Sequence, residues 1–292
     1  MQARPSELDA IISTLTTDIL YNTKRFESWY LLGKCYSFVV EDDLTWTSDK
    51  LASRDKKQAT AFAEKKAILC YLMALNLYLS TSSQVNSELM KNDNKIVFRG
   101  LLEALGKEML QAYVKPMTSM SYTWKPKPVL IMKEDGTLVN LQVVDKPSIS
   151  ETNIRKCILT ILAKADALYE TDKERSWTNP FYISKVHLKT DKTLFKNRGI
   201  HLLQEACKLS LLQSSVSGND TILEAHYTLV SACYKCFKEK IFSLEEALEQ
   251  LKLDDGFFGL SDEEWEIKEE KEFYTLIIKL LKFILSKDKH KW

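Results

Sequence analysis

Small and aromatic residues recur at the 3.6-residue spacing of an α-helix in two segments, and this pattern limits the possible folds more than any other feature. The repeated positions are Trp29, Leu32, Gly33, Tyr36, Ala67, Tyr71 and Ala74. Small residues let two helix backbones approach closely, while the aromatic rings fill the space that remains between them. The sequence therefore predicts two packed helices, at about residues 26–40 and 58–80.

The spacing within these helices is typical of one kind of helical repeat. W-x-x-L-G-x-x-Y, from Trp29 to Tyr36, matches the first helix of a tetratricopeptide repeat, and the spacing from Ala67 to Ala74 matches the second. We interpret the seven residues as the repeat core. Ala67 follows Trp29 at a greater distance than in a regular repeat, which predicts an insertion at residues 41–62.

The insertion is the first candidate for a partner-binding surface, because a longer turn extends from the edge of a helical stack. It combines acidic, aromatic and basic side chains, and the candidate residues are Glu41, Asp42, Asp43, Trp46, Lys56 and Lys57. The alternative is that Trp46 folds back on its own repeat and that the charges are solvated.

The rest of the chain also favours helices. It has only eight glycines and six prolines in 292 residues, so few positions interrupt a helix. We predict an all-α, tetratricopeptide-like α-solenoid with one short β-hairpin at about 129–145, where Asp135-Gly136 is a strong hairpin signal. The expected regions are a repeat region at 1–115, a linker and hairpin at 116–147, and a second helical region at 148–292, continuous with the first.

In the second helical region, helices are expected at about 193–214, 220–240, 243–252 and 262–286, with a connector at 171–192. Ser243 with Glu246, and Ser261 with Glu264, have capping-box spacing at the starts of the last two helices. Acidic residues crowd positions 262–272, where they oppose the helix dipole. The alternative is that this acidic face receives a basic segment of another protein.

Catalytic chemistry is not indicated, and we expect neither a metal nor a cofactor. His226, Cys233 and Cys236 suggest a zinc corner, but a four-ligand site needs one more ligand, the two cysteines lie inside a continuous helix pattern, and no second ligand pair follows at suitable spacing. The net charge of +1 gives no field that would attract nucleic acid or an anionic membrane, so direct sequence-specific nucleic-acid binding is not expected. The sequence has no signal peptide and no apolar run long enough to span a membrane.

The segment FESWYLLGKCYSFVVEDDLTWTSDKL, from Phe26 to Leu51, resembles the cabin family. That family includes the third, scaffold subunit of the HIR histone-deposition complex and the calcineurin-binding cabin proteins. A second segment, EAHYTLVSACYKCFKEK at 224–240, is similar to a helix of the family, but Ala225 replaces a proline. Because members of the family are far longer, we interpret this chain as an interior fragment.

The resemblance implies a nuclear, non-catalytic scaffold that supports replication-independent nucleosome assembly and histone gene regulation. Its implied partners are the WD-repeat subunits of the HIR complex, with core histones or another histone chaperone as further candidates. Calcineurin inhibition is not carried over, since it depends on another region of the animal proteins. Two alternatives stay open: an unrelated tetratricopeptide adaptor or co-chaperone that binds peptide segments, and a helical enzyme whose site is assembled from distant residues.

Overall fold

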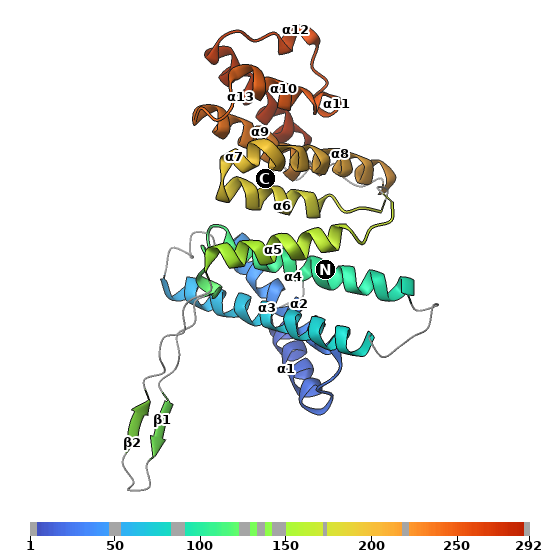
Figure 1. Cartoon of the computed structure of the whole chain (residues 1–292), viewed down its shortest axis with the longest axis vertical. Helices are drawn as coiled ribbons and strands as arrows, with labels where there is room; N and C mark the ends of the chain where they lie inside the picture. The colour runs from blue at the N-terminus through green and yellow to red at the C-terminus, as the bar shows by residue number, and fades with distance from the viewer. Residues whose placement is uncertain are drawn as a thin grey trace. The chain divides into compact units, whose positions relative to one another are not determined.

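Helices form nearly all of the regular structure in the computed structural model of the chain (Figure 1). The structure describes residues 5–46, 54–82, 91–122, 129–132, 138–141, 150–171, 174–217 and 222–288. The chain divides into two compact units, Met1–Ile158 and Leu159–Trp292. The division falls within helix α5 (Glu151–Asp166), whose first turn is capped by Ser150, because its hydroxyl accepts a hydrogen bond from the Asn153 amide at 3.3 Å.

The first unit is built on three long helices that follow one another as neighbours. Its elements before α5 are α1 (Pro5–Tyr21), α2 (Phe26–Trp46), α3 (Arg54–Ser82), α4 (Lys91–Tyr113) and the short 3₁₀ helix η3 (Met120–Tyr122). Helix α2 packs along α3, α3 packs along α4, and α1 packs against α2. The predicted pairing of the helices at 26–40 and 58–80 is therefore present, and both helices are longer than expected.

The contact between α2 and α3 depends on the absence of a side chain at Gly33. A Cβ atom built at Gly33 would lie 2.8 Å from Cε1 of Tyr71, closer than carbon atoms pack. Ala67 and Ala74 are fully buried on α3, and Leu32 is buried on α2. Trp29 is half-buried rather than interior, and it packs against two separate clusters of buried residues, one around Leu32 and one around Ala74.

Residues 41–62 do not form a separate loop in the part of the chain that the structure describes. Helix α2 continues through Trp46 and α3 begins at Arg54, so both ends of the expected insertion are helical. The Thr60 hydroxyl donates a hydrogen bond to Asp43 Oδ2 at 2.8 Å, which ties the two helical extensions together. The insertion thus lengthens the helix pair, while residues 47–53 lie outside the described residues.

Two short strands lie in the range expected for the hairpin. Strand β1 (Val129–Met132) pairs antiparallel with β2 (Leu138–Leu141), and Val129 faces Leu141 in the register. The predicted turn at Asp135-Gly136 lies outside the described residues.

The second unit consists of shorter helices around one core. They are α6 (Thr178–Thr190), α7 (Lys192–Leu194), the π-helical turn η4 (Phe195–Gly199), α8 (Ile200–Ser217), α9 (Glu224–Lys238), α10 (Leu244–Lys252), α11 (Asp255–Phe258), α12 (Asp262–Trp265) and α13 (Glu270–Lys287). Helix α8 packs against α6 and α9, and α9 also packs against α10 and α13. Phe181, Phe195 and Phe273 are fully buried in the core that these helices share.

Two predictions for this unit were wrong. The expected connector at 171–192 contains helix α6, because Pro180 lies within the first turn, where a proline needs no intrahelical partner. The single helix expected at 262–286 is divided into α12 and α13, and Glu269 begins the second with its own capping box. The predicted capping boxes at Ser243 and Ser261 are both present.

Candidate functional site

Helix α3 exposes a row of large apolar side chains, which we call the α3 stripe. Its members have exposed fractions between 36% and 61%, and they are Phe62, Leu69, Leu72, Met73 and Leu79. The intervals of seven, three and seven residues from Phe62 through Leu69 and Leu72 to Leu79 place them along one face of the helix. A contiguous exposed apolar face of this kind is typical of a surface that binds another protein.

The charges beside the stripe are mostly positive. Helix α3 contains five basic residues, at positions 54, 56, 57, 65 and 66, and two acids, the exposed Asp55 and Glu64. Glu64 is buried, so it does not offset the surface charge. The Nζ atom of Lys66 lies 4.7 Å from the centre of the Phe62 ring and 5.0 Å from that of Tyr36. The α3 stripe therefore combines apolar side chains with a cationic border.

The acidic candidates from the sequence lie at the end of α2, and two of them contact their own unit. Glu41 accepts a hydrogen bond from Lys107 Nζ at 2.5 Å, and Asp43 accepts one from Thr60. Asp42 is exposed, whereas the side chain of Trp46 lies outside the described part of the chain. Lys56 is exposed and Lys57 is half-buried at the start of α3. Two of the three acidic side chains therefore already have hydrogen-bond partners within the first unit.

Two buried carboxyl groups lie inside the first unit, and the sequence reasoning missed both. Ser121 on η3 donates a hydrogen bond to Oε2 of Glu64, and Ser37 on α2 donates one to Oε2 of Glu108 at 2.6 Å. The Oε1 atoms of Glu64 and Glu108 have no hydrogen-bond partner among the described residues. Each carboxyl group therefore leaves one oxygen unsatisfied in the bundle interior, which is costly for an ionised group.

Burial is the main cause of a raised pKa at both groups. It raises the pKa of Glu64 to about 8, with a further contribution from the nearby Glu108, and the pKa of Glu108 to about 7. The hydrogen bonds from Ser121 and Ser37 act in the opposite direction. Each carboxyl group is hydrogen-bonded to a serine of a neighbouring element, so we expect its protonation to affect folding stability.

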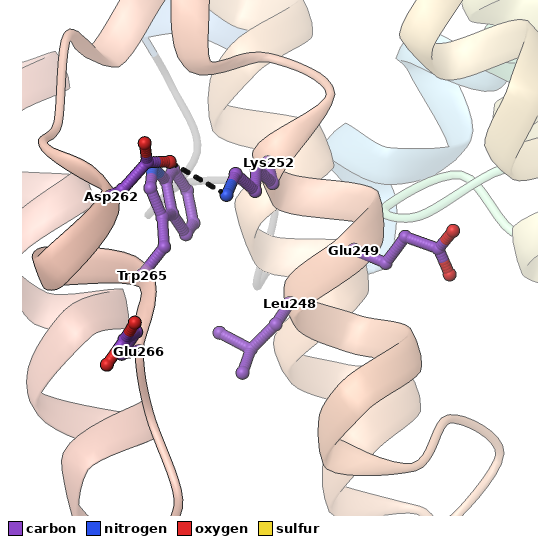
Figure 2. Close-up of a pocket in the computed structure, with 6 residues that line it drawn as sticks. All are labelled: Leu248, Glu249, Lys252, Asp262, Trp265 and Glu266. Atoms are coloured by element: carbon purple, nitrogen blue, oxygen red, sulfur yellow. Dashed lines mark hydrogen bonds and ion pairs between the residues drawn. The ribbon is translucent and has the colours of Figure 1, made fainter.

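The second unit has an open hollow between α10 and α12 (Figure 2). Its lining residues are Leu248, Glu249, Lys252, Asp262, Trp265 and Glu266. Lys252 Nζ forms an ion pair with Asp262 at 3.0 Å, which leaves the carboxylates of Glu249 and Glu266 as an excess of negative charge. This hollow includes part of the acidic stretch that the sequence suggested as a site for basic segments.

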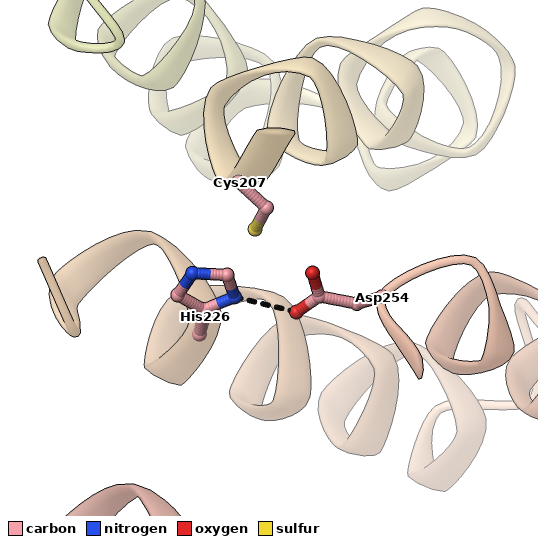
Figure 3. A group of neighbouring side chains, drawn as sticks. All are labelled: Cys207, His226 and Asp254. Atoms are coloured by element: carbon pink, nitrogen blue, oxygen red, sulfur yellow. Dashed lines mark hydrogen bonds and ion pairs between the residues drawn. The ribbon is translucent and has the colours of Figure 1, made fainter. Parts of the chain in front are cut away.

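The zinc corner considered from the sequence is arranged differently in the structure. Cys233 and Cys236 are buried in the continuous helix α9, as expected for structural thiols. His226 instead lies beside Cys207 of α8 and Asp254, which follows α10 (Figure 3). Sequence reasoning could not have paired these residues by spacing, since they are 19 and 28 positions from His226.

Among the described residues, no helix is both long enough and apolar enough to cross a membrane. Each unit is a set of packed helices with buried cores, and its polar clusters are either buried or form shallow surface features. These properties define a helical protein of two packed units.

Comparison with known proteins identifies the family. Residues 1–169 match the family described as the HIR3 helical bundle domain, and residues 199–292 match the HIR3 TPR domain. The chain belongs to the HIR3 family. The recognisable W-x-x-L-G-x-x-Y motif lies in the helical bundle rather than in the matched TPR domain, whose repeats the sequence reasoning did not recognise.

Curated relatives cover the full chain. A protein of Kluyveromyces lactis is 77% identical over 292 residues, one of Eremothecium gossypii is 43% identical, and one of Candida glabrata is 37% identical. Each is named histone transcription regulator 3 homolog. The matched part amounts to 18%, 18% and 19% of these relatives, so the chain spans about a fifth of their length.

Proposed function

We propose that this chain is a non-catalytic scaffold segment of a HIR-type histone chaperone complex, which acts in the nucleus in replication-independent nucleosome assembly and histone gene regulation. Membership of the HIR3 family and the names of its relatives support this assignment. In this proposal the helices form successive layers of an α-solenoid, with the repeat region at 1–115, the hairpin segment at 116–147 and the second helical region at 148–292.

The observation that carries the proposal is the α3 stripe. A scaffold must present a surface that is stable without its partner and becomes buried on binding. Leu69 and Leu72 lie near the middle of the stripe, with exposed fractions of 54% and 41%. Burying such residues supplies most of the affinity, while the lysines at its border select the partner by charge. We assign the stripe to a WD-repeat subunit that offers an apolar surface with an acidic border.

The test is a pull-down of each WD-repeat subunit by chain 1–292, carrying Leu69→Asp or no substitution. A charge in the centre of the interface should weaken retention at least about tenfold, since about 1.4 kcal/mol corresponds to a factor of ten. Ile278→Asp is the matched control, because Ile278 is 53% exposed on α13, compared with 54% for Leu69. Failure of the unsubstituted chain to retain any of these subunits, or equal retention by both variants, would contradict the proposal.

A second candidate function has its own observation, the acidic hollow of Figure 2. Glu249 and Glu266 line the hollow together with the buried Trp265, and a basic segment of a core histone could place its charges on these carboxylates. Binding of a histone-tail peptide should then fall as salt increases. Glu249→Gln together with Glu266→Gln should abolish that binding, whereas Glu245→Gln, on the same helix but outside the hollow, should leave it unchanged. A peptide array would separate both functions from that of a general peptide-binding adaptor.

A further inference from the structure

The second unit contains a mixed group of three potential metal ligands in its core. Cys207 Sγ, a ring nitrogen of His226 and a carboxylate oxygen of Asp254 all lie within 4.8 Å of one another. Their exposed fractions are 1%, 0% and 6%. They come from α8, from α9 and from the turn that follows α10, and Figure 3 shows the sulfur above the gap between His226 and Asp254. A group bound here would connect three segments that are distant in the sequence.

The hydrogen bonds around His226 fix which of its nitrogens faces this gap. Ser210 Oγ donates a hydrogen bond to the backbone carbonyl of Cys207 at 2.7 Å, so its proton is already in use. The same oxygen lies 3.3 Å from His226 Nε2, and it can therefore only accept a proton from that nitrogen. The ring of Phe257 is stacked on the imidazole at 3.7 Å and holds its plane. Nε2 thus carries a proton, and Nδ1 is directed at Asp254.

The short contact between His226 and Asp254 requires a proton or a metal ion between the two atoms. Nδ1 and Oδ2 of Asp254 are 2.6 Å apart, and two lone pairs at this distance need either a proton or a metal ion. A ring nitrogen fixed by a hydrogen bond on its other nitrogen is the usual arrangement of a histidine that binds a metal. Sulfur, nitrogen and oxygen ligands together match the preference of zinc.

We propose that Cys207, His226 and Asp254 form a buried binding site for one divalent zinc-type metal ion. The ion takes the place of the proton between Nδ1 and Asp254 and also binds the Cys207 sulfur. In a tetrahedral zinc site the ligand nitrogen and oxygen are about 3.3 Å apart, so the carboxylate has to move about 0.7 Å away from the ring. Its second oxygen, Oδ1, is available for the fourth position.

The exchange is balanced in charge and in protons. Without metal, a protonated His226 and an ionised Asp254 cancel, and the Cys207 thiol is neutral. Binding of M²⁺ releases two protons, one from Nδ1 and one from the thiol, and leaves a neutral imidazole, a thiolate and a carboxylate around a 2+ ion. The net charge of the site is zero in both states, as burial requires. Because two protons leave when the ion enters, binding should strengthen as pH rises.

The experiment uses untagged chain 1–292, first treated with a chelator and then titrated with Co²⁺ as a spectroscopic probe. We expect one equivalent to bind with a thiolate-to-cobalt absorption band, and two protons to be released in weakly buffered solution. Zn²⁺ at about 100 times its Kd should raise Tm by about 5–10 °C. These three results come from the unsubstituted chain and do not depend on whether a variant folds.

The variant Cys207→Ser should lose the absorption band and the Zn²⁺ effect on Tm. Cys236→Ser is the control, because Cys236 is equally buried in the same core but lies outside the ligand group. Absence of cobalt binding by the unsubstituted chain, cobalt binding without a thiolate band, or a band that persists in Cys207→Ser would each overturn the proposal. Failure of the WD-repeat pull-down would leave it intact, since the α3 stripe and this cluster belong to separate units.

Discussion

The buried carboxyl of Glu64 makes the stability of the first unit depend on pH in a direction that can be measured. Its pKa is about 8 in the folded chain, against an ordinary value of 4.5. A group with a raised pKa in the folded state binds more protons there than in the unfolded state. Its stabilising effect is therefore complete below pH 4.5, declines as pH rises, and is lost by about pH 8. Glu64→Gln, which mimics the protonated side chain without titrating, should remove this dependence.

The expected size follows from the interval between the two pKa values. Each pH unit in which the folded state keeps a proton that the unfolded state has lost costs about 1.4 kcal/mol. Between pH 5 and pH 7.5, unfolding of the unsubstituted unit should thus become easier by about 3 kcal/mol relative to Glu64→Gln. Glu108 raises the pKa of Glu64 through charge repulsion, so Glu108→Gln should reduce this difference.

A global melting curve would mix the two units, so the assay is hydrogen exchange of amides in α3 and α4, corrected for the pH dependence of intrinsic exchange. Glu27→Gln is the control, because Glu27 is exposed on α2 and its substitution removes a carboxyl group without altering the bundle interior. The reasoning would be refuted if the difference in unfolding free energy between Glu64→Gln and the unsubstituted chain stayed constant from pH 5 to pH 8. It would mean that Glu64 is ionised inside the bundle and that water or a cation compensates it.

Three further substitutions test the packing. Gly33→Ala should destabilise α3 by about 1–3 kcal/mol in hydrogen exchange, because the new Cβ would lie 2.8 Å from a ring carbon of Tyr71. Gly100→Ala is the control: its Cβ would have its nearest heavy atom at 4.0 Å, so it should be neutral or stabilising. Trp29→Ala should cost about 2–3 kcal/mol in the same assay, below the range for a fully buried tryptophan, since this ring is half-buried. Arg175→Lys should lower Tm in calorimetry, because the guanidinium donates two hydrogen bonds to Asp166 at 2.5 and 2.8 Å that an ammonium group cannot reproduce.

The sequence predicted those features of the fold that depend on residues close together in the chain. The close approach at Gly33 follows from the W-x-x-L-G-x-x-Y spacing, and the helix starts at Ser243 and Ser261 follow from their capping boxes. Helix α6 was missed because the segment 171–192, which contains Pro180, was interpreted as a connector, although a proline in a first turn is compatible with a helix. The division between α12 and α13 was missed because acidic residues continue through it without a change in composition.

The candidate sites were less accessible to sequence reasoning because they depend on packing between distant segments. In the sequence, Glu64 and Glu108 look like ordinary helix residues. Glu64 is a buried acid only because η3 places Ser121 against its carboxyl group. Likewise Asp254 lies between α10 and α11, 47 residues after Cys207, and nothing local in the sequence connects the two residues. Long-range contacts of this kind leave no periodic signal in a single sequence.

The α3 stripe did have a signal, because α3 is apolar on more than one face. One face carries Tyr71 and Ala74 into the contact with α2, while the opposite face exposes Leu69 and Leu72. A helix that is apolar all round is normally enclosed by other protein. Helices α2 and α4 already cover the buried face of α3, so folding of this unit does not require the exposed face to be apolar. Its apolar residues are accounted for if α3 becomes an interior helix when the scaffold and its partner assemble.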